Sequence, residues 1–242
     1  MKTEIKIFSD QSELAWQVAN ELSIMVNESD STGKNFTLAL SGGSTPKILY
    51  TVLGDHFSDK INWETVHLFW SDERCVPPDD TESNFGMTKK ALLDKINIPS
   101  VNVHRIFGEN DPLQESVRYS GVIRDFTNTG DGFPVFDLVL LGLGEDGHTA
   151  SIFPGNNQLF LSKNICEPAF HPSTYQKRIT LTGRTLNNAQ RIIFLVTGEN
   201  KAGIISSIFS GAEEKNYPAA QIKPDNGTLK WYLDKAASRA IV

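Results

Sequence analysis

The stretch FDLVLLGLGEDGHTASIFPG, residues 136–155, decides how this sequence is expected to fold. Its beginning, residues 136–141, is the most apolar strand-like run in the chain, and a glycine-rich loop follows it directly. A continuous apolar run of this length is typical of a strand that is covered on both faces. The stretch therefore predicts a central strand of a buried sheet, with a polar loop at its carboxyl end.

On either side of this strand, the spacing of apolar residues switches repeatedly between strand-like and helix-like. We expect further strands at residues 5–8, 36–40, 66–70, 103–107, 178–182, 191–196 and 229–233. Helical spacing predicts helices near residues 14–25, 48–53, 83–95, 112–126 and 200–209, with a small helical tail. This alternation favours an α/β fold, a mainly parallel sheet with helices on both faces. Because no linker, repeat or low-complexity tract interrupts it, we expect a single domain over residues 1–242.

Length, composition and charge narrow the functional classes. The chain has 242 residues, 39% of them hydrophobic, and a formal net charge of −6. A chain of this size buries roughly 70–75% of its unfolded surface, so it folds without disulfides or metals. No basic run exceeds a pair and no apolar run could span a bilayer, so we expect neither nucleic acid nor membrane as a partner. We predict a cytoplasmic protein, because the two cysteines are far apart and the N-terminus lacks a signal-peptide pattern. The sequence also gives no evidence of an obligate protein partner.

Four polar clusters each follow an expected strand directly, at residues 41–46, 71–74, 142–149 and 198–201. In open α/β sheets, ligands bind at the carboxyl ends of the strands, where loops and helix N-termini converge. We therefore expect the four clusters to form one shared site. An acidic protein needs a local cluster of donors to bind an anion, and these loops carry such donors.

The first cluster, SGGSTP at residues 41–46, predicts a phosphate-binding turn. Its glycines let the backbone turn sharply with the N–H groups outward, and its hydroxyls add donors. Pro46 suits the first helical position, with Ser44 or Thr45 as the N-cap, which leaves a helix N-terminus open to an anion. A P-loop is absent, and a simple capped turn would also fit. The candidate phosphate-binding residues here are Ser41, Gly42, Gly43, Ser44 and Thr45.

The glycine-rich loop GLGEDG, residues 142–147, matches the GxGxxG dinucleotide fingerprint. However, Pro154 leaves little room for the long helix that fingerprint requires, which disfavours a nucleotide-dependent oxidoreductase. The alternative interpretation pairs Asp146 with His148. Histidine has a pKa of about 6.5, which suits proton transfer, and a nearby carboxylate can hold one tautomer of the ring. A purely structural histidine is the other possibility.

The remaining clusters supply charged side chains. Arg74 could bind a phosphate with two hydrogen bonds, and the preceding Asp72 and Glu73 could orient it or polarise a ligand hydroxyl. Lys201 opens a helix, where it could reach an anion, and Arg178 begins a strand. Each of these charges is also compatible with a solvated surface. GxSxG and HExxH patterns are absent and the five histidines are dispersed, which disfavours an acyl-enzyme nucleophile and a metal site.

Taken together, the motifs resemble the glucosamine-6-phosphate isomerase/6-phosphogluconolactonase family, on its lactonase side. They are LALSGGSTP (38–46), FWSDERCVP (69–77), Ser83-Asn84, LVLLGLGEDGHTASIFPG (138–155), RITLT (178–182), TGENKA (197–202) and WYLDKAA (231–237). The resemblance implies a modified Rossmann-like α/β fold, as in glucosamine-6-phosphate deaminases and 6-phosphogluconolactonases. It implies hydrolysis of 6-phosphoglucono-1,5-lactone, a sugar-phosphate lactone of the oxidative pentose phosphate pathway, without a metal or organic cofactor.

The resemblance also implies roles for the site residues. His148 would remove a proton from the water that attacks C1, with Asp146 orienting its ring. The phosphate would lie between the backbone of residues 41–45, Arg74 and Lys201, with Arg178 as a further contact. Asp72 and Gly144 complete the expected substrate-binding residues, and glycine-loop N–H groups are plausible oxyanion donors.

Two alternatives stay open at this point. One is a sugar-phosphate deaminase, whose motif has a glutamate five residues after the histidine and a tyrosine after the acidic pair. Here those positions are Phe153 and Arg74, so the deaminase relay is broken. The other is a sugar-phosphate-binding protein that has lost catalysis, against which the intact Asp146 and His148 argue.

Overall fold

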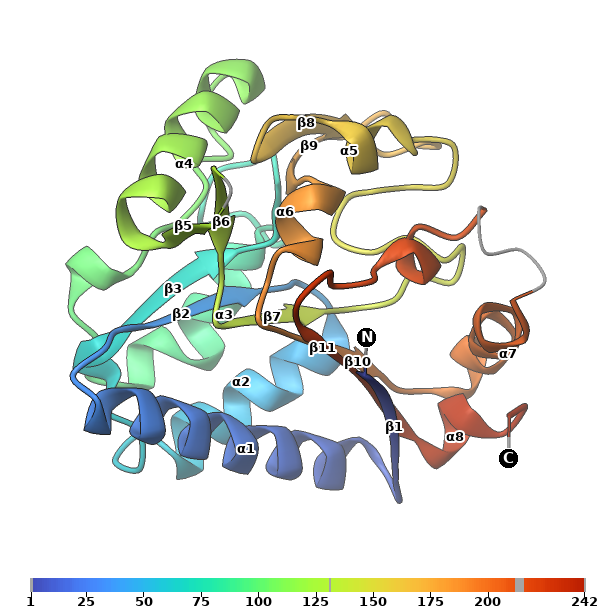
Figure 1. Cartoon of the computed structure of the whole chain (residues 1–242), viewed down its shortest axis with the longest axis horizontal. Coiled ribbons are helices and arrows are strands. Elements are labelled where there is room, and N and C mark those ends of the chain that lie inside the picture. The colour runs from blue at the N-terminus through green and yellow to red at the C-terminus, as the bar shows by residue number, and fades with distance from the viewer. Residues whose placement is uncertain (1, 131, 212–215, 242) are drawn as a thin grey trace.

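The computed structural model describes residues 2–130, 132–211 and 216–241. Its main layer is a parallel sheet of six strands in the order β1-β11-β10-β7-β2-β3, seen edge-on across the centre of Figure 1. The strands are β1 (Lys2–Phe8), β2 (Phe36–Leu40), β3 (Val66–Trp70), β7 (Leu138–Leu141), β10 (Arg191–Val196) and β11 (Thr228–Asp234). The predicted α/β fold with a mainly parallel sheet is confirmed. The apolar run at residues 136–141 contains β7, which is one of the two central strands of the sheet.

Helices cover both faces of this sheet, as the alternating pattern predicts. Helices α1 (Gln11–Ser31) and α2 (Ser44–His56) lie on one face, and α4 (Pro112–Phe126) and α6 (Gly183–Asn187) lie on the other (Figure 1). The other helices are α3 (Asn84–Ala91), α5 (Gln158–Leu161), α7 (Ala202–Ser210) and α8 (Lys235–Ser238). Short 3₁₀ turns occupy Trp63–Thr65, Leu93–Lys95, Ser100–Asn102, Glu199–Lys201 and Pro218–Gln221. Among the described helices, none is long and apolar enough to cross a bilayer.

A second, antiparallel sheet was not anticipated as a separate layer. It consists of β4 (Asp72–Arg74), β9 (Lys177–Leu181) and β8 (Cys166–Phe170), and a hairpin of β5 (Asn128–Gly130) and β6 (Phe133–Val135) stands apart from it. Residues 71–74 were expected to be a polar loop, and the strand at 178–182 was expected in the main sheet. Both expectations are corrected, because β4 and β9 pair with each other.

The expected strand at residues 103–107 does not form. Only a single bridge joins Val103 to Leu68, and the backbone beyond it is bound by side chains of α4 instead. Glu115 accepts the N–H of Phe107 at 2.8 Å, and Arg118 donates to the carbonyl of Arg105 at 3.1 Å. Because these side chains satisfy the backbone groups, the segment needs no strand partner.

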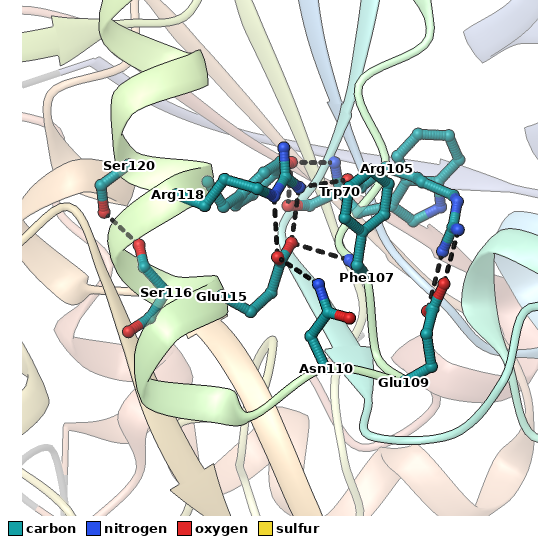
Figure 2. A network of polar contacts seen from close by, with 10 residues as sticks. Trp70, Arg105, Phe107, Glu109, Asn110, Glu115, Ser116, Arg118 and Ser120 are labelled. Atoms are coloured by element: carbon teal, nitrogen blue, oxygen red, sulfur yellow. Dashed lines mark hydrogen bonds and ion pairs between the residues drawn. The ribbon is translucent and has the colours of Figure 1, made fainter.

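Figure 2 shows this network, in which Glu115 and Arg118 of α4 bind the segment that contains Arg105 and Phe107. The side chain of Glu115 is fully buried, and Arg118 donates to it and stacks over the ring of Phe107 at 3.9 Å. The segment so held contains Gly108, where a Cβ atom would lie 2.3 Å from the carbonyl oxygen of Arg74. Gly108 therefore lies directly against the backbone of Arg74, a candidate anion-binding residue.

Two buried tyrosines hold the strand ends next to the polar clusters. The hydroxyl of Tyr50 accepts the N–H of Ser41 at 3.0 Å and donates to its carbonyl at 2.8 Å, just after β2. At the end of β3, the hydroxyl of Tyr119 accepts the N–H of Trp70 at 2.8 Å and donates to its carbonyl at 3.0 Å. Each hydroxyl replaces a strand partner where the sheet ends, so the loops that follow start from fixed positions.

Candidate active site

A cavity of about 390 Å³ opens at the carboxyl edge of the main sheet. All four polar clusters contribute to its wall, as expected from their positions after β2, β3, β7 and β10. Of the residues singled out from the sequence, Ser41, Gly42, Gly43, Ser44, Thr45, Asp72, Arg74, Gly144, His148, Arg178 and Lys201 line it. Asp146 does not line the cavity but contacts His148 from behind.

His148 and Asp146 form a close pair. The ring Nδ1 of His148 lies 2.6 Å from Oδ1 of Asp146, and the backbone N–H of His148 donates to the same oxygen at 3.1 Å. Burial raises the pKa of Asp146, but the hydrogen bonds and charge of His148 outweigh it, so that pKa lies below its ordinary value. An ionised Asp146 accepts from Nδ1–H, which leaves Nε2 of His148 as the nitrogen free to take a proton at the cavity.

Gly144 makes this pair sterically possible. A Cβ atom at position 144 would lie 2.1 Å from Nδ1 of His148 and 2.6 Å from Oδ1 of Asp146. The loop is also folded so that the N–H of Gly144 donates to the carbonyl of His148 at 2.8 Å. The glycine pattern after β7 thus makes room for an acid–base pair rather than for a dinucleotide.

Two arginines face each other across the second sheet. Antiparallel pairing of β4 and β9 places Arg74 opposite Arg178, an arrangement of like charges that destabilises a sheet unless something compensates it. Within the described ranges neither arginine forms an ion pair, and the Nε–H of each is buried without a hydrogen-bond partner. Burial, and then the charge of Arg74, lowers the pKa of Arg178. An anion in the cavity would relieve this repulsion.

The N-terminus of α2 is more open than expected. Its N-cap is Gly43, at a φ of 107° that favours glycine, and Ser44 is already helical, so the expected cap at Ser44 or Thr45 is wrong. The hydroxyl of Thr45 instead contacts that of Thr197 at 2.7 Å. With no side chain capping the helix, its first N–H groups remain available, and the buried hydroxyl of Ser41 also lacks a partner in the described structure.

The acidic pair after β3 divides into two roles. Asp72 lines the cavity and accepts a hydrogen bond from Ser151 at 2.6 Å. Glu73 is turned away and accepts the N–H groups of Asn84 and Phe85 at the start of α3, while burial raises its pKa. Of the two acids that were expected to orient Arg74 or to polarise a ligand hydroxyl, Asp72 lines the cavity and Glu73 does not.

Lys201 is a third cation that lines the cavity. Burial lowers its pKa, against the charges of Glu145 and Asp146. It ends the 3₁₀ turn that follows Gly198, whose φ is 99°. The neighbouring Asn200 donates to Glu145 at 2.6 Å and so joins this turn to the glycine-rich loop.

Several lining residues were not selected from the sequence. They are Pro46, Asn84, Gly142, Leu143, Glu145, Ala150, Leu195, Val196, Thr197 and Asn200. In the sequence, Asn84 stands out only as part of the Ser83-Asn84 motif. A Cβ atom at Gly42 would lie 1.9 Å from its Oδ1, so the Asn84 side chain can occupy this position only because residue 42 is glycine. Ala150 has a φ of 49°, in the left-handed region, and no sequence pattern predicted this conformation. In the described ranges, no three His, Cys, Asp or Glu side chains gather as metal ligands.

Comparison with known proteins places these features in a family context. Residues 9–231 match the family model described as glucosamine-6-phosphate isomerases/6-phosphogluconolactonase. A 6-phosphogluconolactonase of Haemophilus influenzae is 46% identical, over 84% of this chain and 87% of the relative. The crystal structure of a devB protein aligns with a TM-score of 0.94 at 40% identity, over 99% of this chain and 100% of that one. A monomeric glucosamine-6-phosphate deaminase aligns with a TM-score of 0.81 at 21% identity, over 99% and 100% of the two chains, a likeness of fold alone.

Proposed function

The chain belongs to the glucosamine-6-phosphate isomerase/6-phosphogluconolactonase family, and from this premise we propose that it hydrolyses 6-phosphoglucono-1,5-lactone to 6-phosphogluconate. The observation that supports this proposal best is the set of residues that line or adjoin one cavity. It combines a histidine held by a carboxylate with two arginines and a lysine that form no ion pair within 4.0 Å among the described residues. A proton acceptor and an anion site in one cavity suit a phosphorylated ester.

The proposed reaction needs a positioned water, a base and a stabilised oxyanion, because a lactone is already an activated ester. His148 Nε2 takes a proton from water as its oxygen bonds to C1. The tetrahedral intermediate then collapses with cleavage of the bond between C1 and the ring oxygen, which receives the proton as it becomes a hydroxyl. Asp146 keeps the ring in the required tautomer and stabilises the imidazolium that forms between these steps.

The phosphate is proposed to lie among Arg74, Arg178, Lys201 and the open N–H groups of α2. Arginine side chains can bind phosphate oxygens in pairs, and the helix N-terminus adds dipole and hydrogen bonds. Because such contacts hold C1 at the water, their loss can lower kcat as well as raise KM. The pairing of β4 and β9, which sets Arg74 opposite Arg178, supports an anion at this place.

The environment of His148 also favours lactone hydrolysis over deamination. Phe153, the residue at the position of the deaminases' relay glutamate, is buried and packs against the His148 ring with centroids 4.7 Å apart. An apolar ring there cannot relay a proton. His148 has Asp146 as its hydrogen-bonded partner instead, which suits a base that acts on water directly.

The proposal is tested by the reaction itself. The lactone is generated in situ from glucose 6-phosphate, and 6-phosphogluconate formation is followed above the spontaneous rate. Acceleration by the protein is the expected result. If there is none, ammonia release from glucosamine 6-phosphate is measured next, and activity there would replace the lactonase proposal with the deaminase one.

Replacing Gly144 by alanine is expected to lower kcat at least about tenfold without unfolding the protein, because the new methyl group displaces the His148 ring. Steady-state kinetics and the thermal unfolding midpoint measure the two effects. Gly121→Ala is the matched control, since a Cβ atom at that position in α4 meets nothing within 4 Å. Full activity in Gly144→Ala would mean that the observed pairing of His148 and Asp146 is not required.

A further inference from the structure

Asp234, at the end of β11, has contacts that the reaction described above does not use. Its side chain is buried, and its two carboxylate oxygens accept the N–H of Gly198, each at 3.1 Å. One of them also accepts the N–H of Ala237 at 2.7 Å and so caps α8. The buried carboxylate of Asp234 thus joins the end of β11 to the loop at Gly198, which follows the neighbouring strand β10.

The loop that Asp234 holds is the one that presents Lys201 to the cavity. Gly198 has a φ of 99°, and its carbonyl accepts the N–H of Lys201 at 3.1 Å, which closes the 3₁₀ turn. The position of the turn therefore follows from the orientation of the Gly198 peptide. A hydrogen bond to a carboxylate is stronger than one between neutral groups, so it favours one orientation of this glycine peptide.

The other contacts of this turn are more exposed. Glu199 pairs with Arg239, but both side chains are mostly in solvent, where an ion pair contributes little. Asn200 contacts the exposed Glu145 across the cavity mouth. Among the described contacts of the turn, the bond from Gly198 to Asp234 is less exposed than the contacts of Glu199 and Asn200, and its acceptor is a buried carboxylate.

We propose that Asp234 is a positioning residue for substrate capture: it orients Gly198 and thereby fixes Lys201 at the phosphate end of the cavity. The inference rests on the proposed function for its substrate, but its structural part does not. Asp234 does not line the cavity, so in this proposal it acts on the cavity through the Gly198 loop. Its removal is expected to weaken binding of the phosphate group and to leave the chemistry at His148 unchanged.

The test uses two substitutions that separate the contacts of Asp234. Asp234→Ser keeps a hydroxyl that can still cap α8, because serine is a preferred N-cap, but it loses the charge and the second oxygen. Asp234→Asn keeps an oxygen acceptor in the same place and should partly restore function. Asp10→Ser is the matched control, since Asp10 caps α1 in the same way and does not line the cavity.

In Asp234→Ser, KM for the phosphorylated lactone is expected to rise about tenfold with kcat within about twofold, the change produced by a loss of about 1.4 kcal/mol. The Kd for inorganic phosphate should rise in parallel, while kcat/KM for unphosphorylated glucono-1,5-lactone should not change. The Gly198 amide proton should shift upfield in NMR spectra of the ligand-free variant. Asp234→Asn should fall between the variant and the wild type.

Two outcomes would overturn the inference. One is unchanged phosphate affinity in a variant whose Gly198 amide has lost its bond. The other is an equal loss on both lactones, which would indicate a merely structural role. If Asp234→Ser does not fold, Asp234→Asn is judged by the same measurements. If the wild type fails to hydrolyse the lactone, the proposed function fails, while the phosphate and amide measurements still decide the role of Asp234.

Discussion

Replacing His148 by alanine or asparagine is expected to lower kcat for 6-phosphoglucono-1,5-lactone at least about a hundredfold, because a general base contributes about 10²–10⁴ in rate. The fold should remain intact. The His148 side chain is about one-third exposed, at 32%, and its main contacts are Asp146 and the edge of the aromatic cluster at Phe153. KM should change little, since His148 is placed at the reacting carbon and not at the phosphate.

His171→Ala is the matched control for this experiment. His171 also packs against Phe153, with centroids 5.1 Å apart, but it does not line the cavity. Its substitution removes a comparable aromatic contact without removing the base, so turnover should stay within about twofold of the wild type. Rates near those of the wild type in both His148 variants would remove His148 from the role of base.

Replacing Arg74 or Arg178 by alanine is expected to lower kcat/KM for the phosphorylated lactone by about 10- to 150-fold. That range corresponds to the loss of one charge-assisted hydrogen-bonding group, about 1.5–3 kcal/mol. The loss on unphosphorylated glucono-1,5-lactone should be less than about threefold, because it has no phosphate to bind. The ligand-free protein should not lose stability through charge, since the substitution ends the repulsion between facing cations.

The control for the arginines is Lys177→Ala, a cation exposed at the start of β9 that does not line the cavity. It should leave both kcat/KM values unchanged. Parallel assays with the two lactones, together with a titration of inorganic phosphate, measure the effect. Equal losses on both substrates would contradict a phosphate role for Arg74 and Arg178 and would point to a general disturbance of the β4–β9 pair.

The elements that were predicted most closely are those whose signals lie within one short segment. The strands β2, β3 and β10 and the helix α4 have the bounds expected from the sequence. Continuous apolar runs or a proline at a helix start mark them locally. The segment at 103–107 has a similar apolar pattern, yet Glu115 and Arg118 bind its backbone from a helix further along the chain. A local sequence pattern cannot show that distant side chains will bind this backbone in place of a neighbouring strand.

The candidate site divides in the same way. Its loops could be located from the sequence alone, because the carboxyl ends of parallel strands meet at one edge of a sheet, and the lining of the cavity agrees with this. The partners of its residues could not. Glu73 accepts the first N–H groups of α3 and does not line the cavity. Gly43 is the N-cap of α2 in place of a hydroxyl residue, and Asp234 accepts the N–H of Gly198.

By itself, the sequence determined the α/β alternation, the four loops of the site and the types of side chain they carry. These follow from apolar spacing and from chain connectivity, which act over a few residues. Only the tertiary structure decided that Arg74 faces Arg178, that Gly144 leaves room for the His148–Asp146 pair, and that Asp234 lies behind Lys201's loop. The arginine pair and the Asp234–Gly198 contact join residues far apart in the chain, and packing sets their distances. Gly144, Asp146 and His148 are close in the chain, but the space around the pair depends on how their loop folds.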